Sequence, residues 1–401
     1  MISRDTVDDV ILETHSKELR SRLLPTHVVI YYVIALSLFF GDGYEEVMRR
    51  LVGGLRFLRT WSDDWKIPTT SAISQARARV GEEPLRELFH RVAVPISRRG
   101  HAHSWFHGRR LMAVDGVVID MPDTPENNDE YQHTKSGNGQ SAFPVARVVG
   151  LGECGSHAIV SATIGSWATG ERTLIYDLLA DFEPDMLVLA DRGFYSYELW
   201  IAALDTGAAL LFRASANMRF PVLDSYPDGS YRSVLLDPNI QRQTRQKARR
   251  LGDDAVLEAA GTPCRIVEYS LDRDPSNEVI CLITSILDPD EAPAHELAAL
   301  YHERWEFELA LKEIEIYQMG HPRVLRSKTP EMVRQEIWGF LLAHYAIRHL
   351  MHQAATTADI DPDRLSFIRT LRLVRRQITD QAGFSPSHDQ ESQIRGDRRD
   401  H

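Results

Sequence analysis

The chain has 401 residues, of which 43% are apolar and 26% charged, and a formal net charge of −11. This composition predicts a globular protein of about two or three domains and excludes a disordered chain. The acidic balance argues against a protein that coats nucleic acid, although basic residues gathered in clusters can still bind it.

The cellular setting can be predicted from the cysteines and the apolar runs. Cys154, Cys264 and Cys281 lie far apart, which argues against a disulfide framework and fits a reducing cytoplasm. The first residues lack the pattern of a signal peptide. The longest apolar run, Val28–Phe40, is too short to span a bilayer. We therefore expect a cytoplasmic protein without a membrane span, in which this run is a buried helix.

Residues 1–105 are predicted to form a helical N-terminal domain. Spacing and capping signals predict a short helix after Pro68–Ser71 and further helices over Thr6–Leu24, Val28–Phe40, Tyr44–Leu58 and Leu85–Val94. The helix after Pro68–Ser71 and the helix over Leu85–Val94 suggest a unit like a helix-turn-helix. A basic segment, Arg98–Arg110, follows. Its histidines match no metal-ligand spacing, so it is either a solvated linker or a contact for DNA.

From residue 106 the pattern changes to strands that alternate with helices. Apolar and β-branched runs predict strands over Leu111–Met121, Ala142–Leu151, His157–Ile164, Met186–Ala190 and Ala208–Arg213. Helices are predicted over Leu174–Asp181 and Tyr195–Leu204. Because Met186–Ala190 is apolar throughout, we expect that strand to be covered on both faces. These elements predict a mixed α/β fold.

Residues 214–292 have a different pattern, in which proline and glycine separate short β-like runs. We expect a β-rich insertion there. Within it, Gln241–Arg250 holds five basic residues and no acidic one. We expect a set of its cations to contact DNA phosphates, the alternative being a solvated loop. These cations are Arg245, Lys247, Arg249 and Arg250. Helices are predicted again over Glu331–Gln353 and Asp361–Ile378, and the polar tail from Ala382 is predicted to be disordered.

The stretch Tyr301–Glu315 is predicted to be one helix with an unusual distribution of charge. At about 100° per residue, a polar stripe lies between two apolar flanks. The stripe consists of Tyr301, Arg304, Glu308, Lys312 and Glu315. The flanks are Leu300, Phe307, Leu311 and Ile314 on one side and Trp305, Leu309 and Ile316 on the other. Glu303, Glu306 and Glu313 are predicted to face water. Charges on such a stripe are costly unless they are paired or metal-bound. Glu308 is therefore either half of a structural ion pair with Arg304 or a catalytic carboxylate.

Two aspartates are further candidates for a site. Asp115 interrupts an apolar strand beside Gly116, and Asp191 follows a buried strand at its carboxyl end, where α/β sheets place ligands. Structural alternatives are a bulge at Asp115 and a capped turn at Asp191. If both converge with Glu308, the three carboxylates form an oxygen cage for Mg²⁺ or Mn²⁺, and two such ions can support phosphoryl transfer. The side chains expected to bind phosphate there are Tyr301, Arg304 and Lys312.

Several blocks of the chain resemble the DDE transposases of the insertion-sequence-four type. Tyr301, Arg304 and Glu308 within YHERWEFELALK resemble the Y-x2-R-x3-E signature of that family. LMAVDGVVIDMPDTPEN and VLADRGFYS resemble the blocks around its first and second aspartates, and LPTHVVIYYVIALSLFFGDGYEEV resembles its N-terminal helical domain. One position departs from the signature: the family has a lysine seven residues after the glutamate, where this chain has Glu315. Lys312 can cover part of that role.

The resemblance implies a ribonuclease H-like catalytic domain in two parts, residues 106–213 and 293–355, separated by the insertion at 214–292. It implies that residues 1–105 bind DNA and that 356–401 form a helical C-terminal segment. It also implies that Asp115, Asp191 and Glu308 are the catalytic residues and bind the metal, expected to be two Mg²⁺ or Mn²⁺ ions.

The function implied by the resemblance is cut-and-paste transposition of an insertion sequence. The enzyme, expected to be a homodimer on DNA, would bind terminal inverted repeats and nick them with an activated water. The freed 3′-hydroxyl would then attack, first in a hairpin step and later in the target. The alternatives are a metal-dependent nuclease of the same fold without strand transfer and a catalytically decayed DNA-binding derivative, which Glu315 leaves open.

Overall fold

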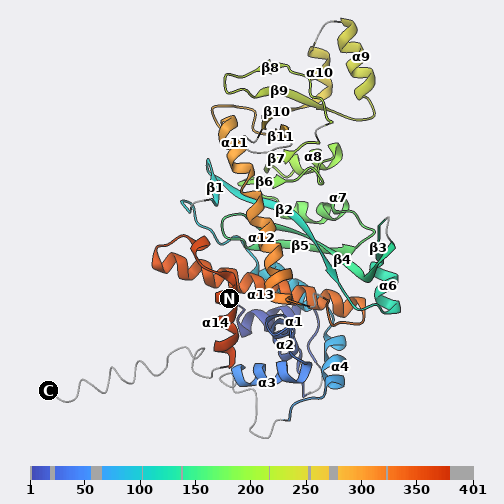
Figure 1. Ribbon diagram of the computed structural model, residues 1–401, viewed down its shortest axis with the longest axis vertical. Coiled ribbons are helices and arrows are strands. Elements are labelled where there is room, and N and C mark those ends of the chain that lie inside the picture. Colours follow the sequence, from blue (N-terminus) through green and yellow to red (C-terminus); the bar gives the residue numbers. More distant parts are fainter. Residues whose placement is uncertain are drawn as a thin grey trace, which may run out of the picture.

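A mixed β-sheet lies at the centre of the structure, with a helical layer at one end and a smaller lobe at the other (Figure 1). The computed structural model describes residues 2–18, 23–55, 66–101, 103–136, 139–215, 217–251, 254–270, 279–321 and 324–379. Within these residues the strand order is β3-β4-β2-β6-β7-β11-β10-β9-β8, with β1 beside β2 and β5 beside β4. The strands are β1 (Trp105–Phe106), β2 (Arg109–Asp120), β3 (His133–Ser136), β4 (Gly139–Glu153), β5 (Ile159–Ser166), β6 (Met186–Ala190), β7 (Ala209–Arg213), β8 (Asp224–Ser225), β9 (Tyr231–Leu236), β10 (Gly261–Ser270) and β11 (Val279–Thr284).

The helices surround this sheet. They are α1 (Arg4–Glu13), α2 (Thr26–Leu38), α3 (Tyr44–Leu55), α4 (Thr70–Val80), α5 (Glu83–Val92), α6 (Pro125–Tyr131), α7 (Glu171–Leu174), α8 (Tyr197–Leu204), α9 (Gln241–Leu251), α10 (Ala255–Ala260), α11 (Ala294–Tyr301), α12 (Arg304–Lys312), α13 (Pro330–Ala358) and α14 (Phe367–Thr379). Two 3₁₀ helices, η2 (Ile175–Asp181) and η4 (Pro362–Arg364), and one π-helix, η3 (Glu313–Met319), complete the described elements.

The half of the sheet that positions the site has five strands and helices on both faces. Strands β5, β4 and β2 pair antiparallel in that order, and β6 and β7 follow parallel to β2. On one face, Phe307 of α12 packs on the bare backbone of Gly150 and Gly152 in β4. On the other face, Leu174 of α7 packs on Gly165 in β5. This arrangement confirms the predicted ribonuclease H-like fold.

The insertion continues the same sheet. Strand β11 pairs antiparallel with β7, and β10, β9 and β8 follow it outward. Helices α9 and α10 pack on the outer strands β9 and β10 through a small core, whose buried members are Val234, Leu236, Ala248 and Leu257. Figure 1 shows that this places α9 at the end of the molecule far from the N-terminal helices.

The N-terminal helices pack on the long helix α13. Helix α2 has buried residues on all of its sides, as its uniformly apolar sequence predicts. Gly339 lets α13 approach α2 closely, since a Cβ there would lie 2.9 Å from the Val33 carbonyl oxygen. Helix α4 begins as predicted, with the Thr69 hydroxyl accepting a bond from the Ala72 N–H at 3.3 Å. No described helix has the length and apolar character needed to cross a bilayer.

Two sequence predictions of secondary structure are wrong outside the site. Helix α1 ends at Glu13 instead of Leu24, because the chain turns at His15, whose φ of 51° is left-handed. The insertion, expected to consist of β-like runs, also contains the helices α9 and α10. Its basic stretch is rich in arginine, lysine and glutamine, which are good helix formers. Residues 56–58 of the third predicted helix and the tail from Ala382 lie outside the described residues.

We predict that Gly152→Ala destabilises the fold by about 1–3 kcal/mol, because overpacking a dense interior forces backbone shifts. A Cβ at this position would lie 1.9 Å from Cε2 of the Phe307 ring. Urea denaturation would measure the loss, and Gly41→Ala, where a Cβ meets nothing within 4 Å, is the control. The double variant Gly152→Ala with Phe307→Leu should recover part of the stability. A Gly152→Ala protein as stable as the wild type would show that α12 does not depend on this contact.

Candidate active site

Asp115 and Asp191 lie side by side because of the sheet register. Val114 of β2 is paired with Ala190 of β6, so the two aspartates are the next residues on adjacent parallel strands. Parallel neighbours lie about 5 Å apart. The structure therefore brings the two predicted aspartates close together.

Glycine allows Asp115 to occupy its position. The Gly116 N–H donates to Asp115 Oδ1 at 2.8 Å. A Cβ at residue 116 would lie 2.7 Å from Oε1 of Glu171, which belongs to the first turn of α7 on the opposite face. Glu171 is in turn paired with Arg147 of β4 at 3.3 Å. The structural alternative for Asp115, a bulge, does not occur, since its pairing with Gly150 and the pairs on either side stay in register.

Arg304 joins Asp115 to Glu308. Arg304 is 5% exposed. Its two terminal nitrogens contact different carboxylates: Nη1 lies 3.3 Å from Asp115 Oδ2, and Nη2 lies 2.6 Å from Glu308 Oε1. Lys312 lies on the solvent side, with Nζ 3.6 Å from Glu308 Oε2. The ion pair that the sequence offered as an alternative is therefore present, and it extends to Asp115.

Asp191 is held by two residues from other elements. The Tyr301 hydroxyl at the end of α11 lies 3.3 Å from Asp191 Oδ1 and 3.5 Å from the carbonyl oxygen of Ala190. Tyr301 is 4% exposed and its hydroxyl faces Asp191, and its expected contact with a phosphate stays a prediction. Arg213, the last residue of β7, lies 3.9 Å from the same oxygen. Sequence reasoning missed Arg213, although a charged residue ending a buried strand next to Asp191 was a usable signal.

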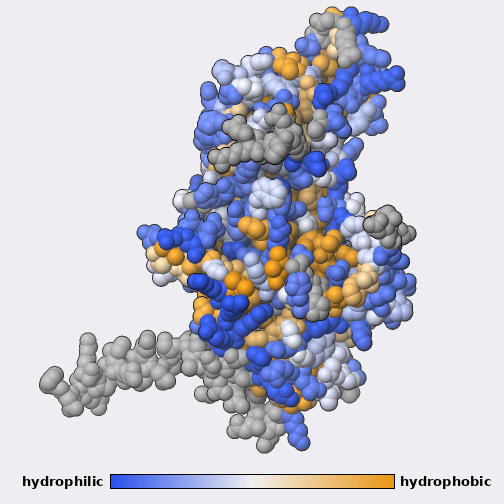
Figure 2. Space-filling model, viewed as in Figure 1, coloured by the Kyte–Doolittle hydropathy of each residue, from blue (hydrophilic) through white to orange (hydrophobic). Residues whose placement is uncertain are grey.

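The predicted single helix over Tyr301–Glu315 is interrupted twice. Helix α11 ends at Tyr301, α12 begins at Arg304, and the π-helix begins at Glu313. The first apolar flank is buried as predicted. The second is exposed, with Trp305, Leu309 and Ile316 at 53%, 46% and 39%, and orange apolar residues are visible over α12 in Figure 2.

Three glutamates of this stretch were predicted to face water, but each of them contacts another residue of the protein. Glu303 contacts His103, Glu306 contacts His157, and Glu313 is buried against Arg348. The prediction rested on the spacing of residues along one helix. Such spacing does not reveal the polar residues of α13 and of the β4–β5 turn, which pack against this helix in the fold.

The electrostatics of the site centre on Asp115. Burial raises its pKa from the ordinary value of 3.8 to about 6. The Gly116 N–H and the charge of Arg304 oppose the rise, whereas the charges of Glu308 and Glu171 add to it. Burial is therefore the main reason that the charged form of Asp115 is disfavoured in this site.

The predicted basic clusters differ in how far they are engaged within the protein. Arg109 pairs with Glu291, and Arg110 pairs with Glu153. In α9, Lys247 and Arg250 are exposed and Arg245 donates to the Arg219 carbonyl oxygen at 2.8 Å. The side chain of Arg249 lies outside the described residues. Figure 2 shows a strongly hydrophilic surface over α9.

Most of the chain matches two known protein families. Residues 1–90 match the family described as Insertion element 4 transposase N-terminal, and residues 106–346 match the Transposase DDE domain. The chain belongs to the DDE transposase family. It is a DNA transposase, and the two families confirm the resemblance drawn from its motifs.

Individual relatives extend this assignment. This transposase is 27% identical over 395 residues to Transposase InsG for insertion sequence element IS4 of Escherichia coli (strain K12), a match that covers 95% of this chain and 82% of the relative. It is 30% identical over 189 residues to Putative transposase InsZ of the same organism, covering 47% of this chain and 60% of the relative. A cryo-EM structure of the piggyBac transposase synaptic complex with hairpin DNA is similar with a TM-score of 0.48 and 10% identity, over 99% of this chain and 83% of that one.

DDE transposases generally use divalent metal ions, and the side chains of this transposase fit such ions in kind. Carboxylate oxygens are the ligands that hard cations prefer, and Asp115, Asp191 and Glu308 each supply one carboxylate. Among the described residues, no three His, Cys, Asp or Glu side chains are arranged closely enough to hold a metal. Arg304 instead pairs with two of the candidate carboxylates, so metal binding requires them to turn away from it.

We predict that the metal-free transposase loses up to about 3 kcal/mol of stability between pH 4 and pH 7 through Asp115. The folded-state pKa of about 6 lies above the ordinary value of 3.8. In this interval the folded state therefore binds more protons than the unfolded state, and raising the pH favours unfolding. Asp115→Asn removes this ionisation, so its stability relative to the wild type should rise with pH. Urea denaturation in a chelator would measure this, with exposed Asp129→Asn as the control, and parallel curves for Asp115→Asn and wild type would contradict it.

Proposed function

We propose that this transposase performs cut-and-paste transposition of an insertion sequence, with Asp115, Asp191 and Glu308 as its catalytic carboxylates. Two observations support this proposal: Asp115 and Asp191 follow paired residues of adjacent parallel strands, and Arg304 contacts the carboxylates of both Asp115 and Glu308. Two Mg²⁺ or Mn²⁺ ions would be held by these three side chains. When bound, such ions activate an attacking oxygen and stabilise a leaving one in phosphoryl transfer.

The other side chains of the site have proposed roles that follow from their contacts. Tyr301 and Arg213 hold Asp191 at the end of β6. Arg304 neutralises Asp115 and Glu308 before the ions bind, and its planar fork can then bind a phosphate of the DNA strand. Lys312, which is half-exposed beside Glu308, is placed to neutralise a second phosphate.

The proposed domain division assigns DNA binding to residues 1–105 and catalysis to 106–213 and 293–355. The insertion at 214–292 would contact DNA through α9, and 356–401 would form the C-terminal segment. The two family matches, at 1–90 and 106–346, support this division. We further propose that two copies assemble on paired DNA ends in the bacterial cytoplasm. Light scattering would measure the mass of the DNA complex and so the number of copies in it.

A catalytically decayed derivative is the second candidate, because of Glu315. Burial and the charge of Glu315 raise the pKa of Asp120, so a negative charge acts where the family signature has a lysine. Cleavage of a labelled transposon end separates the candidates: strand transfer indicates a transposase in full, cleavage alone a nuclease, and binding alone a decayed copy.

We predict that Asp191→Asn abolishes strand cleavage, by at least about 100-fold, while DNA binding without metal is unchanged. The carboxylate serves the metal, whereas DNA affinity comes from basic surfaces. Gel-shift assays in chelator and cleavage assays in Mg²⁺ would measure the two, with the exposed Asp205→Asn as the control. If binding falls in proportion to cleavage, Asp191 is structural.

A second prediction concerns α9, where we expect exposed cations to contact DNA phosphates. Each contact contributes about 0.9 to the slope of log affinity against log salt concentration. Replacing Arg245, Lys247, Arg249 and Arg250 with alanine should therefore flatten that slope by roughly two to four units. The control is the variant Gln243→Ala with Gln246→Ala, which changes two exposed uncharged side chains of the same helix. An unchanged slope in the folded quadruple variant would show that α9 lies outside the DNA path.

A further inference from the structure

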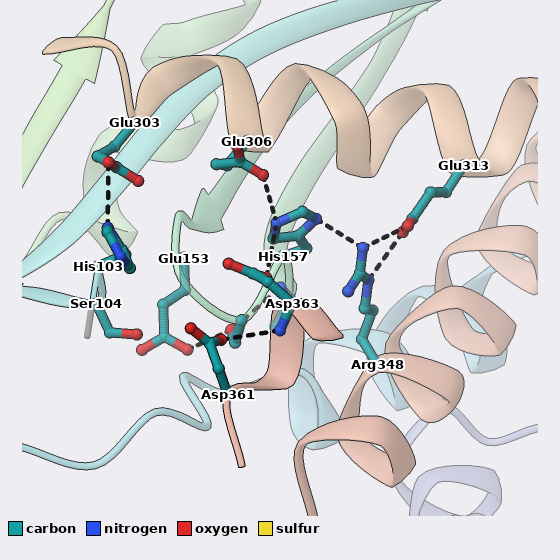
Figure 3. Close-up of polar contacts among 12 residues, drawn as sticks. His103, Ser104, Glu153, His157, Glu303, Glu306, Glu313, Arg348, Asp361 and Asp363 are labelled. Carbon is teal, nitrogen blue, oxygen red and sulfur yellow. Dashed lines mark hydrogen bonds and ion pairs between the residues drawn. The ribbon is translucent and has the colours of Figure 1, made fainter. Parts of the chain in front are cut away.

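The face of α12 that points away from the carboxylates contacts a buried polar network (Figure 3). Glu306 Oε2 lies 3.0 Å from His157 Nε2 in the β4–β5 turn. His157 Nδ1 lies 2.6 Å from Nη2 of Arg348 on α13. Arg348 also donates two hydrogen bonds to the Glu313 carboxylate, one from Nη2 and one from Nε at 2.8 Å. A continuous chain of contacts therefore runs from Glu306 to Glu313 through two other elements.

The network fixes the state of its central histidine. Because an arginine N–H can only donate, His157 Nδ1 must accept from Arg348 and carries no proton. The remaining proton is on Nε2, which faces Glu306 and, at 3.6 Å, Asp363. His157 adopts a left-handed backbone with φ of 58°, so the turn holds it in a conformation that few residues other than glycine adopt.

The charges of this network are buried and paired. Arg348 and Glu313 are 5% and 6% exposed, and His157 is 4% exposed. Burial raises the pKa of Glu313, but the hydrogen bond from His344 and the charge of Arg348 outweigh it, so the pKa lies below the ordinary value and Glu313 is charged. A buried ion pair tolerates little displacement, since a shift leaves each charge without its partner.

The turn that carries His157 is itself anchored to the sheet. Glu153, the last residue of β4, is fully buried and accepts bonds from the backbone N–H groups of Ile96 and Ser97 at 3.2 and 2.9 Å. It also pairs with Arg110 at the start of β2, the strand that carries Asp115. The contact from His157 to Glu306 therefore relates α12 to the same strands that position the aspartates.

The spacing along α12 makes this contact control rotation. Glu306 and Glu308 are two residues apart, about 200° around the helix, so they point to nearly opposite sides. Glu313 is seven residues after Glu306, almost two full turns, and returns to the same side. Holding Glu306 and Glu313 together fixes the angle at which Glu308 faces the aspartates, while Phe307 on Gly152 fixes the height of the helix above the sheet.

We propose that His157 and Arg348 are positioning residues that set the rotation of α12, and through it the affinity of the Glu308 site for a divalent cation. This inference rests on the proposed function, in which Glu308 holds the metal. It concerns residues that touch none of the three carboxylates.

His157→Asn tests this proposal best. Asparagine accepts the left-handed backbone of the turn, but its shorter side chain cannot span from Arg348 to Glu306, whereas truncating Arg348 would leave Glu313 buried without its partner. A second variant, Glu306→Ala, breaks the same chain at a half-exposed residue, and Glu306→Gln retains an acceptor for His157. The matched control is Glu296→Ala, which breaks an exposed pair with His107 (2.7 Å) on the preceding helix.

The measurements are the Mg²⁺ dependence of cleavage and Mn²⁺ binding to the DNA-free protein, followed by the paramagnetic resonance signal of the free ion. Thermal unfolding and DNA binding in chelator complete the set. For His157→Asn and Glu306→Ala we expect the half-saturating metal concentration to rise about fivefold or more in both assays, the range of a weakened supporting contact. The rate at saturating metal, the unfolding temperature and metal-free DNA binding should change little. Glu306→Gln should recover most of the metal affinity, and Glu296→Ala should behave as the wild type.

Two results would overturn the inference, and they differ from failure of the proposed function. Metal affinity equal to the wild type in both variants would show that the network does not position Glu308. A loss in which saturating metal restores neither rate nor Mn²⁺ binding, with unfolding at lower temperature, would show that the network serves only the fold. If instead the wild type neither binds Mn²⁺ nor cleaves DNA, the proposed function fails and the inference fails with it.

Discussion

The contact between Arg304 and the two carboxylates of Asp115 and Glu308 is the interaction on which the site depends. The carboxylates come from a strand and a helix that pack together, and without a cation between them their repulsion would push α12 away from β2. A guanidinium can satisfy both because its terminal nitrogens point in different directions. Arg304 is itself buried, so it depends on these carboxylates as much as they depend on it.

This charge balance is useful only because the backbone allows a close approach. Glycine at 150 and 152 leaves β4 bare beneath Phe307, and glycine at 116 leaves room for Glu171 behind Asp115. A side chain at 152 would displace either the helix or the strand, because its Cβ would lie 1.9 Å from the Phe307 ring. The pairing of Val114 with Ala190 sets the remaining distance, between Asp115 and Asp191. The geometry of the site is thus largely a consequence of sheet register and of the missing Cβ at Gly152.

The carboxylates could be predicted from sequence because each breaks a local pattern. Asp115 interrupts an apolar strand, Asp191 directly follows one, and Glu308 lies on a polar stripe, so short windows were sufficient. The breaks in the helix at 302–303 and at Glu313 could not be predicted in this way, since the helical spacing continues through both. The partners of Glu306 and Glu313 were also missed, because His157 and Arg348 lie far away in the sequence and reach α12 only through the fold. Helix α9 was not predicted, because only the charge of this basic run was considered and not the helix propensity of its residues.

The two sides of α12 explain why this segment carries so many charges. An amphipathic helix held only by apolar contacts can rotate or slide by small amounts at little cost, because dispersion and burial are not directional. Ion pairs and hydrogen bonds are directional, and when buried they penalise each departure from one arrangement. The contact of Arg304 with Asp115 fixes α12 from the side of the aspartates, and Glu306 and Glu313 fix it from the opposite side. Polar anchors on both sides add little net stability, but they restrict the helix to one rotation, and a site that must place a carboxylate to within a fraction of an ångström requires that restriction.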